Sequence, residues 1–150
     1  MSKNNPLGYL TISMIDRYVH CPRQFFLEYV EGYALKQPNA NLVFGSIVHE
    51  VIAEALRNDV DPNPDLFLEK WESVGDLSYS YRATHGGMKA VGVKLIKQMS
   101  EFPYPGGVTA VEKAYQTELP DGTILKGTVD GEFESFDEDV VLDWKTSSSK

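Results

Sequence analysis

Hydrophobic positions in the first part of the chain recur with the period of an α-helix. The clearest case is residues 43–59, "VFGSIVHEVIAEALRND", where apolar side chains return at about 100° per residue and form one arc. His49 lies at the edge of this arc, between the expected core and the surface. The segment is therefore predicted to be an amphipathic helix. Its apolar arc consists of Phe44, Val48, Val51, Ile52, Ala55 and Leu56.

Three further segments predict helices. Residues 11–30 have apolar residues at helical spacing, with Thr11 or Ser13 as N-cap candidates, and Ser13 with Asp16 resembles a capping box. Pro22 should interrupt this helix and start a new one, because proline lacks a backbone N–H. The inward positions of the two remaining helices are Leu66, Phe67 and Trp71 in one, and Val91, Leu95, Ile96 and Met99 in the other.

The last third of the chain changes to patterns typical of β-strands. Residues 108–119, 123–136 and 140–147 are predicted to be strands. Turns are expected between them at Pro120–Gly122, where proline and glycine suit a tight reversal, and at Asp137–Asp139. Connections this short join antiparallel neighbours. The pattern therefore predicts an antiparallel meander.

The fold class that follows is α+β. Helices within residues 1–105 should pack on a three-stranded antiparallel meander within residues 106–150. The chain has 150 residues, 42% of them hydrophobic, which suits a single domain with one core. It has no apolar run of membrane-spanning length, and its first residues lack the apolar segment of a signal peptide. With Cys21 as its only cysteine, we expect a cytoplasmic protein without membrane association.

Charge narrows the classes of function. A net charge of −8 argues against broad electrostatic coating of DNA or RNA, which depends on lysine and arginine neutralising phosphates. It does not exclude an enzyme that grips nucleic acid through a bound metal and a narrow groove. Clustered carboxylates can also form a cation site, since they repel one another unless a metal or a proton offsets their charge.

Candidate chemistry gathers near the end of the chain. Asp143 and Lys145 are two residues apart, so they share a face if they lie on a strand. If Phe136 opposes Asp139 in the preceding hairpin, Asp130 lies across from Lys145. All three side chains share one face in every register in which the numbers of two paired residues add up to an odd number. Two aspartates suit Mg²⁺ or Mn²⁺, and a lysine beside them can orient a water or stabilise phosphoryl charge. An imidazole ligand from His49 would tilt the preference toward Mn²⁺.

The order of these motifs resembles the PD-(D/E)XK nuclease superfamily, and within it the RecB-like exonuclease branch with its AddB-type and CRISPR-adaptation members. The resemblance covers most of the chain, through a helical element at residues 12–30 followed by four motifs. These are "FGSIVHEVI", "VEKAYQTEL", "LKGTVDGEF" and "VLDWKTS".

The resemblance implies a metal-dependent DNA exonuclease with Mg²⁺ or Mn²⁺. It implies that His49, Asp130, Asp143 and the backbone carbonyl of Trp144 bind the metal. Asp130, Asp143 and Lys145 would form the catalytic set, with Lys145 serving the attacking water. Glu112 would be an auxiliary acid. DNA ends or single strands would be the substrate, with a helicase or recombination protein as a partner.

The chain also departs from the family pattern. The family's core continues with a Gln…Tyr helix and another strand, so we expect a restriction-endonuclease-like core that is incomplete at its C-terminus. Cys21 stands where cluster-bearing members have their first iron–sulfur ligand, but a cluster needs four ligands and hence a cysteine-bearing continuation. A catalytically incomplete DNA-end or partner-binding scaffold of the same fold is the alternative function. A different metal-dependent hydrolase is the weaker third one.

Each candidate residue also has a purely structural interpretation. His49 can be a hydrogen-bonded residue at a helix edge. Asp143 and Lys145 can form a surface ion pair of little energetic value, and Asp130 before Gly131 can be a turn residue. The remaining candidates are Glu112 as a solvated strand residue, Cys21 as a small buried residue, and Lys89, Lys94 and Lys97 as a solvated helix face.

Overall fold

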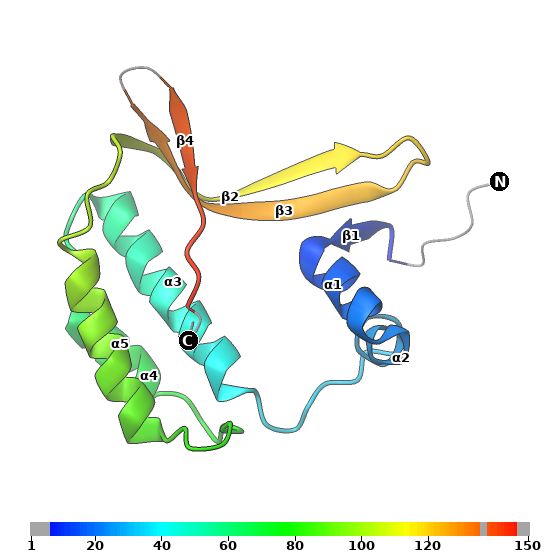
Figure 1. Cartoon of the computed structure of the whole chain (residues 1–150), viewed down its shortest axis with the longest axis horizontal. Coiled ribbons are helices and arrows are strands. Elements are labelled where there is room, and N and C mark those ends of the chain that lie inside the picture. Colours follow the sequence, from blue (N-terminus) through cyan, green and yellow to red (C-terminus); the bar gives the residue numbers. More distant parts are fainter. Residues whose placement is uncertain (1–6, 136–137, 147–150) are drawn as a thin grey trace. The chain divides into compact units, whose positions relative to one another are not determined.

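The computed structural model describes residues 7–135 and 138–146 (Figure 1). They divide into two compact units, each described here by itself. One comprises residues 1–36 with 113–129, and the other residues 37–112 with 130–150. No helix within the described residues combines the length and apolar character that crossing a membrane requires.

The first unit contains the N-terminal helices, the short strand that precedes them and parts of two later strands. The expected break at Pro22 is confirmed, because one helix ends before it and the next begins on it. Thr11 is the N-cap, and its hydroxyl accepts a hydrogen bond from the Met14 N–H at 3.2 Å. The elements up to residue 30 are β1 (Tyr9–Thr11), α1 (Ile12–His20), α2 (Pro22–Phe25) and the π-helical turn η1 (Phe26–Val30).

The second unit contains the three helices that form the main core. They are α3 (Ala40–Asn58), α4 (Pro64–Glu72) and α5 (His85–Met99). Asn39, Asn63 and Thr84 cap their N-termini through side-chain acceptors. The sequence-based expectation of these helices is confirmed, with the first starting three residues earlier than the predicted segment 43–59.

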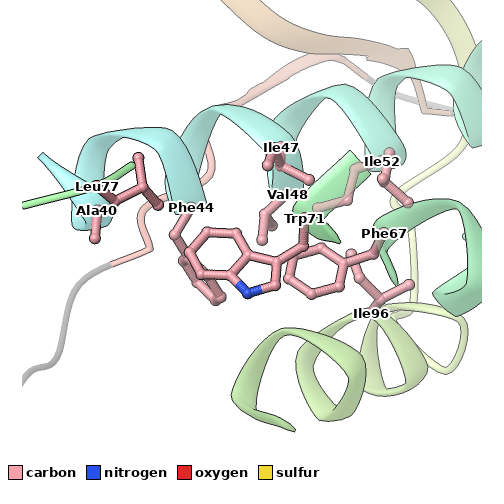
Figure 2. Close-up of a cluster of buried hydrophobic side chains, with 10 residues drawn as sticks. Ala40, Phe44, Ile47, Val48, Ile52, Phe67, Trp71, Leu77 and Ile96 are labelled. Carbon is pink, nitrogen blue, oxygen red and sulfur yellow. The ribbon is translucent and has the colours of Figure 1, made fainter. Parts of the chain in front are cut away.

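The core of the second unit is built around Trp71 and Phe67, both fully buried (Figure 2). Their rings are stacked 6.2 Å apart, and Phe44 of α3 meets the Trp71 ring edge-on at 5.9 Å. α5 approaches the Phe67 ring of α4 closely because Gly92 has no side chain. A Cβ at this position would lie only 1.9 Å from the ring. The inward position expected for Val91 is wrong, since its side chain is 59% exposed.

The sheet is mixed, which corrects the expected plain antiparallel meander. The strands are β1, β2 (Gly107–Glu118), β3 (Ile124–Glu134) and β4 (Asp139–Leu142). Their order is β1-β3-β2, with β4 also pairing with β3. β1 runs parallel to the start of β3, with Leu10 opposite Leu125. β1 was not predicted as a separate strand, because its three residues run directly into the cap of α1.

The pairing of β3 with β4 is antiparallel but differs from the expected register. Glu134 lies opposite Asp139, two residues from the expected partner Phe136, which falls outside the described residues. The hairpin closes at Ser135, whose N–H donates to the Glu138 carbonyl at 3.1 Å. The expected strand up to residue 147 is also wrong, because β4 ends at Leu142.

Candidate metal centre

Three potential metal ligands from distant parts of the sequence meet in the second unit. They are His49 on α3, Glu112 on β2 and Asp130 on β3, and one ligand atom of each lies within 4.8 Å of the others. His49 occupies the edge of the apolar arc and stays partly exposed, so its ring reaches the sheet. Its Nδ1 lies 3.3 Å from Oδ1 of Asp130.

Asp130 is the most buried charged residue of the group, with 9% of its surface exposed. Both carboxylate oxygens have partners, since Oδ1 faces His49 and Oδ2 accepts the Trp144 N–H at 2.7 Å. A carboxylate this buried is costly unless hydrogen bonds or a cation compensate its charge. These contacts fix the orientation of Asp130 and join it to the segment that follows β4.

Glu112 reaches the group through an unusual backbone conformation. Its φ is +51°, in the left-handed region, although the residue lies within β2. A residue other than glycine in that region costs on the order of 1–3 kcal/mol and redirects its side chain relative to the regular alternation of a strand. The expectation of an auxiliary acid at Glu112 therefore acquires a geometry, in which its carboxylate lies beside His49 and Asp130.

Asp143 and Lys145 lie in the extended segment that follows β4. They do not share a strand face, as the sequence pattern suggested, but they do contact each other. Lys145 Nζ lies 2.6 Å from Oδ2 and 2.8 Å from Oδ1 of Asp143. Asp143 is not among the three residues whose ligand atoms converge in the described part of the chain. Extending the β3–β4 register by one residue brings Asp143, and not Lys145, opposite Asp130.

Trp144 holds this segment in position. Its ring packs edge-on against Phe102 at 5.4 Å and against Tyr104 at 6.1 Å. Tyr104 in turn stacks on the buried ring of Phe133 at 5.4 Å. The aromatic anchor and the bond from the Trp144 N–H to Asp130 therefore fix the chain on either side of Asp143 and Lys145.

α3 also contacts the segment directly. A Cβ on Gly45 would lie 2.8 Å from the Oγ1 of Thr146. Gly45 precedes His49 by four residues, so the two positions share one face of the helix. The glycine therefore lets residues 143–146 lie close against the helix face that presents His49.

A cavity of about 410 Å³ opens beside the three ligands. Its lining includes Ser46, Glu50 and Arg57 of α3 in addition to His49, Glu112 and Asp130. Arg57 was not singled out by sequence reasoning, although its spacing of eight residues from His49 places both on one helix face. The volume lies in the range typical of small-molecule and cofactor sites.

One imidazole and two carboxylates fit a divalent cation. Carboxylate oxygens suit Mg²⁺ and Mn²⁺, and an imidazole nitrogen favours Mn²⁺ of these two. Cys21 belongs to the first unit, where its free thiol lies between α1 and α2. The potential ligands that converge in the second unit are therefore nitrogen and oxygen donors, without sulfur.

Comparison with known proteins assigns this arrangement to a family. A model of the PD-(D/E)XK nuclease superfamily matches residues 9–150. No curated protein and no solved structure matches the chain. Members of the superfamily are typically metal-dependent nucleases that act on DNA. The matched range includes His49, Glu112, Asp130, Asp143 and Lys145, and the chain belongs to the PD-(D/E)XK nuclease superfamily.

Proposed function

We propose that this chain is the nuclease domain of a metal-dependent DNA exonuclease of the RecB-like branch. The observation that carries the proposal is the convergence of His49, Glu112 and Asp130 on one cavity, next to the segment that bears Asp143 and Lys145. Family membership supports the nuclease chemistry. The RecB-like branch, the preference for DNA ends and the supply of those ends by a helicase or recombination protein are parts of the proposal.

His49, Glu112 and Asp130 would hold Mg²⁺ or Mn²⁺, and Asp143 with the Trp144 carbonyl would complete the ligand set. A divalent cation bound there lowers the pKa of a bound water and offsets charge on the phosphoryl oxygens. Asp130 is already oriented for this role by its bond from the Trp144 N–H. Preorganised ligands of this kind avoid a reorganisation cost when the substrate binds.

Lys145 would stabilise or orient the attacking water. It is 2.6 Å from Asp143, so the role requires Lys145 to exchange this carboxylate for water or a phosphate oxygen. Recruiting Asp143 as a metal ligand would weaken its pairing with Lys145 and release the ammonium group. An exposed ion pair is worth only about 0–1 kcal/mol, so this exchange is energetically accessible.

Hydrolysis of end-labelled DNA tests the proposal. Linear and circular DNA are incubated with the chain and Mg²⁺ or Mn²⁺, and mononucleotide release is followed. We expect degradation of linear DNA, inhibition by EDTA, and at least about a hundredfold loss of rate in Asp130→Asn and in Lys145→Ala. Glu101→Gln is the matched control, because it removes an exposed charge outside the cavity and should leave the rate unchanged. Equal rates in Asp130→Asn, Lys145→Ala and the parent chain would refute the assigned mechanism.

A DNA-end or partner-binding scaffold of the same fold is the second candidate. It is favoured by the Lys145–Asp143 ion pair, which leaves Lys145 engaged in the structure. Calorimetry separates the two functions, because the exonuclease requires Mn²⁺ binding to the folded chain. DNA binding without Mn²⁺ binding and without hydrolysis would favour the scaffold. Neither function requires an iron–sulfur cluster, and Cys21 alone cannot supply the four ligands that such a cluster needs.

A further inference from the structure

Arg57 is the one cation among the described residues that line the 410 Å³ cavity. It is exposed, and no carboxylate within the described part of the chain is paired with its guanidinium. Three other cations of this unit are ion-paired. Lys70 is bound to Glu50, Lys89 to Glu72 and Lys145 to Asp143.

The helix aims Arg57 along the cavity toward the candidate metal ligands. His49, Ala53 and Arg57 are spaced by four residues and therefore follow one face of α3. Eight residues of helix separate the Cα atoms of His49 and Arg57 by about 12 Å. Side chains in a helix lean toward its N-terminus, which tilts Arg57 toward His49. Ala53 between them is small and almost fully buried, and it lines the same cavity.

A second cavity, of about 520 Å³, also has Arg57 in its lining. Its lining consists of Arg57, its helix neighbours Leu56 and Asp59, and residues 107–111 at the start of β2. Arg57 is thus the residue that the two linings have in common. A flexible polymer that occupied both cavities would contact Arg57 in each.

We propose that Arg57 binds a backbone phosphate of the DNA strand adjacent to the phosphate at the metal centre. The inference rests on the proposed nuclease function and adds the position at which the strand is gripped. A guanidinium offers two parallel N–H donors to a phosphate and remains charged at any physiological pH. In a chain with a net charge of −8, an unpaired arginine at this point supplies a local attraction that the overall charge does not.

DNA binding by the full chain tests the role of Arg57. A fluorescein-labelled dT₁₂ strand is titrated in Ca²⁺, used in place of Mg²⁺ so that binding is measured without turnover. We expect Arg57→Ala to raise Kd about tenfold, as for the loss of one charge-assisted hydrogen-bond pair. The slope of log K against log salt should fall by about 0.7, the value for one phosphate contact on a single strand. Arg57→Lys should recover part of the affinity and the whole salt slope, since it keeps the charge but not the fork.

The matched control is Arg82→Ala, which removes the same charge from an exposed position of the same unit that lines neither cavity. It should change neither Kd nor the salt slope. Mn²⁺ affinity by calorimetry should be equal in the parent chain and in Arg57→Ala, because Arg57 is not a ligand. Equal Kd and slope for Arg57→Ala and the parent would overturn the inference, as would an identical change in Arg82→Ala or no binding of dT₁₂ by the parent chain. Failure of the proposed function appears separately, as absent Mn²⁺ binding or absent hydrolysis.

Discussion

At the scale of single residues, Asp130 and Tyr104 are two buried polar groups with opposite surroundings. Both oxygens of the Asp130 carboxylate have partners. The Tyr104 hydroxyl is buried and has no hydrogen-bond partner among the described residues. Burial, with a smaller effect of the Asp61 carboxylate, raises the pKa of Tyr104 above 10. The Asp130 carboxylate therefore has its charge compensated by hydrogen bonds. The Tyr104 ring contributes to packing, but its hydroxyl is buried without a compensating bond among the described residues.

Removing the Tyr104 hydroxyl should stabilise the protein. Tyr104→Phe keeps the ring that stacks on Phe133 and contacts Trp144, and it eliminates the cost of an unsatisfied buried donor. We expect the free energy of unfolding in urea at pH 7 to rise by about 1 kcal/mol. Tyr81→Phe is the control, because that ring is 89% exposed and its hydroxyl is hydrated in both states. A loss of stability in Tyr104→Phe would show that the hydroxyl has a partner.

The same substitution should change the alkaline limb of stability. Because the pKa of Tyr104 is higher in the folded state, that state holds the proton more tightly than the unfolded chain does. The contribution is fully present below the ordinary tyrosine pKa of about 10 and is lost as the pH rises above it. The parent chain should therefore lose stability above pH 10 more steeply than Tyr104→Phe.

At the scale of elements, the close approach of α3 to the segment after β4 depends on Gly45. Glycine inside a helix costs about 1 kcal/mol relative to alanine, so its presence on the His49 face needs a reason. The reason is Thr146, whose Oγ1 occupies the space that a Cβ would enter. Gly45 therefore lowers the stability of α3 but allows the segment that carries Asp143 and Lys145 to lie close to the helix.

Gly45→Ala should therefore separate stability from activity. The helix gains up to about 1 kcal/mol from alanine, but the Cβ displaces Thr146 and with it the neighbouring site residues. We expect DNA hydrolysis to fall about 10–100-fold while the free energy of unfolding changes by less than about 1 kcal/mol. Adding Thr146→Ala removes the clashing oxygen, so the double variant should recover most of the rate. A double variant as slow as Gly45→Ala would disprove the proposed clash.

Elements with a wide buried face were predictable from sequence, and short or edge elements were not. α3 and α4 appear in the pattern because Phe44, Phe67 and Trp71 recur on faces that are truly buried. Val91 was misassigned because Gly92, which has no side chain to register as apolar, is the residue that faces Phe67. The register of β3 and β4 was missed by two residues because a hairpin's closing pair is set by turn geometry, which alternation does not encode.

The candidate site shows the same division. Motif order was enough to select His49, Glu112 and Asp130, because each belongs to a quoted sequence motif. It left the pairing of Asp143 with Lys145 as an alternative interpretation, since an ion pair between them looks the same in sequence as two catalytic residues sharing a strand face. Nor did it select Arg57, whose proposed role rests on the lack of an ion-pair partner among the described residues and on its place in the linings of two cavities.

At the scale of the whole molecule, the three converging ligands all come from one of the two compact units. His49, Glu112 and Asp130 belong to the second unit, although 81 residues separate His49 from Asp130 in sequence. Glu112 and Asp130 are the residues at which the chain leaves and re-enters that unit. A cation bound there would link α3 to Glu112 of β2 and to Asp130 of β3, and so would stabilise the second unit.

Hydrogen exchange with and without Mn²⁺ tests this coupling. A ligand that binds only the folded state stabilises it by about 2.7 kcal/mol at a concentration of a hundred times its Kd. We expect Mn²⁺ to slow exchange in α3, in residues 107–112 and in the β3–β4 hairpin, and to leave α1 and α2 of the first unit unchanged. Asp130→Asn should abolish the effect, and Glu101→Gln should preserve it. Equal slowing in both units would contradict the expectation that each unit opens independently. It would mean that the two units unfold as one cooperative body.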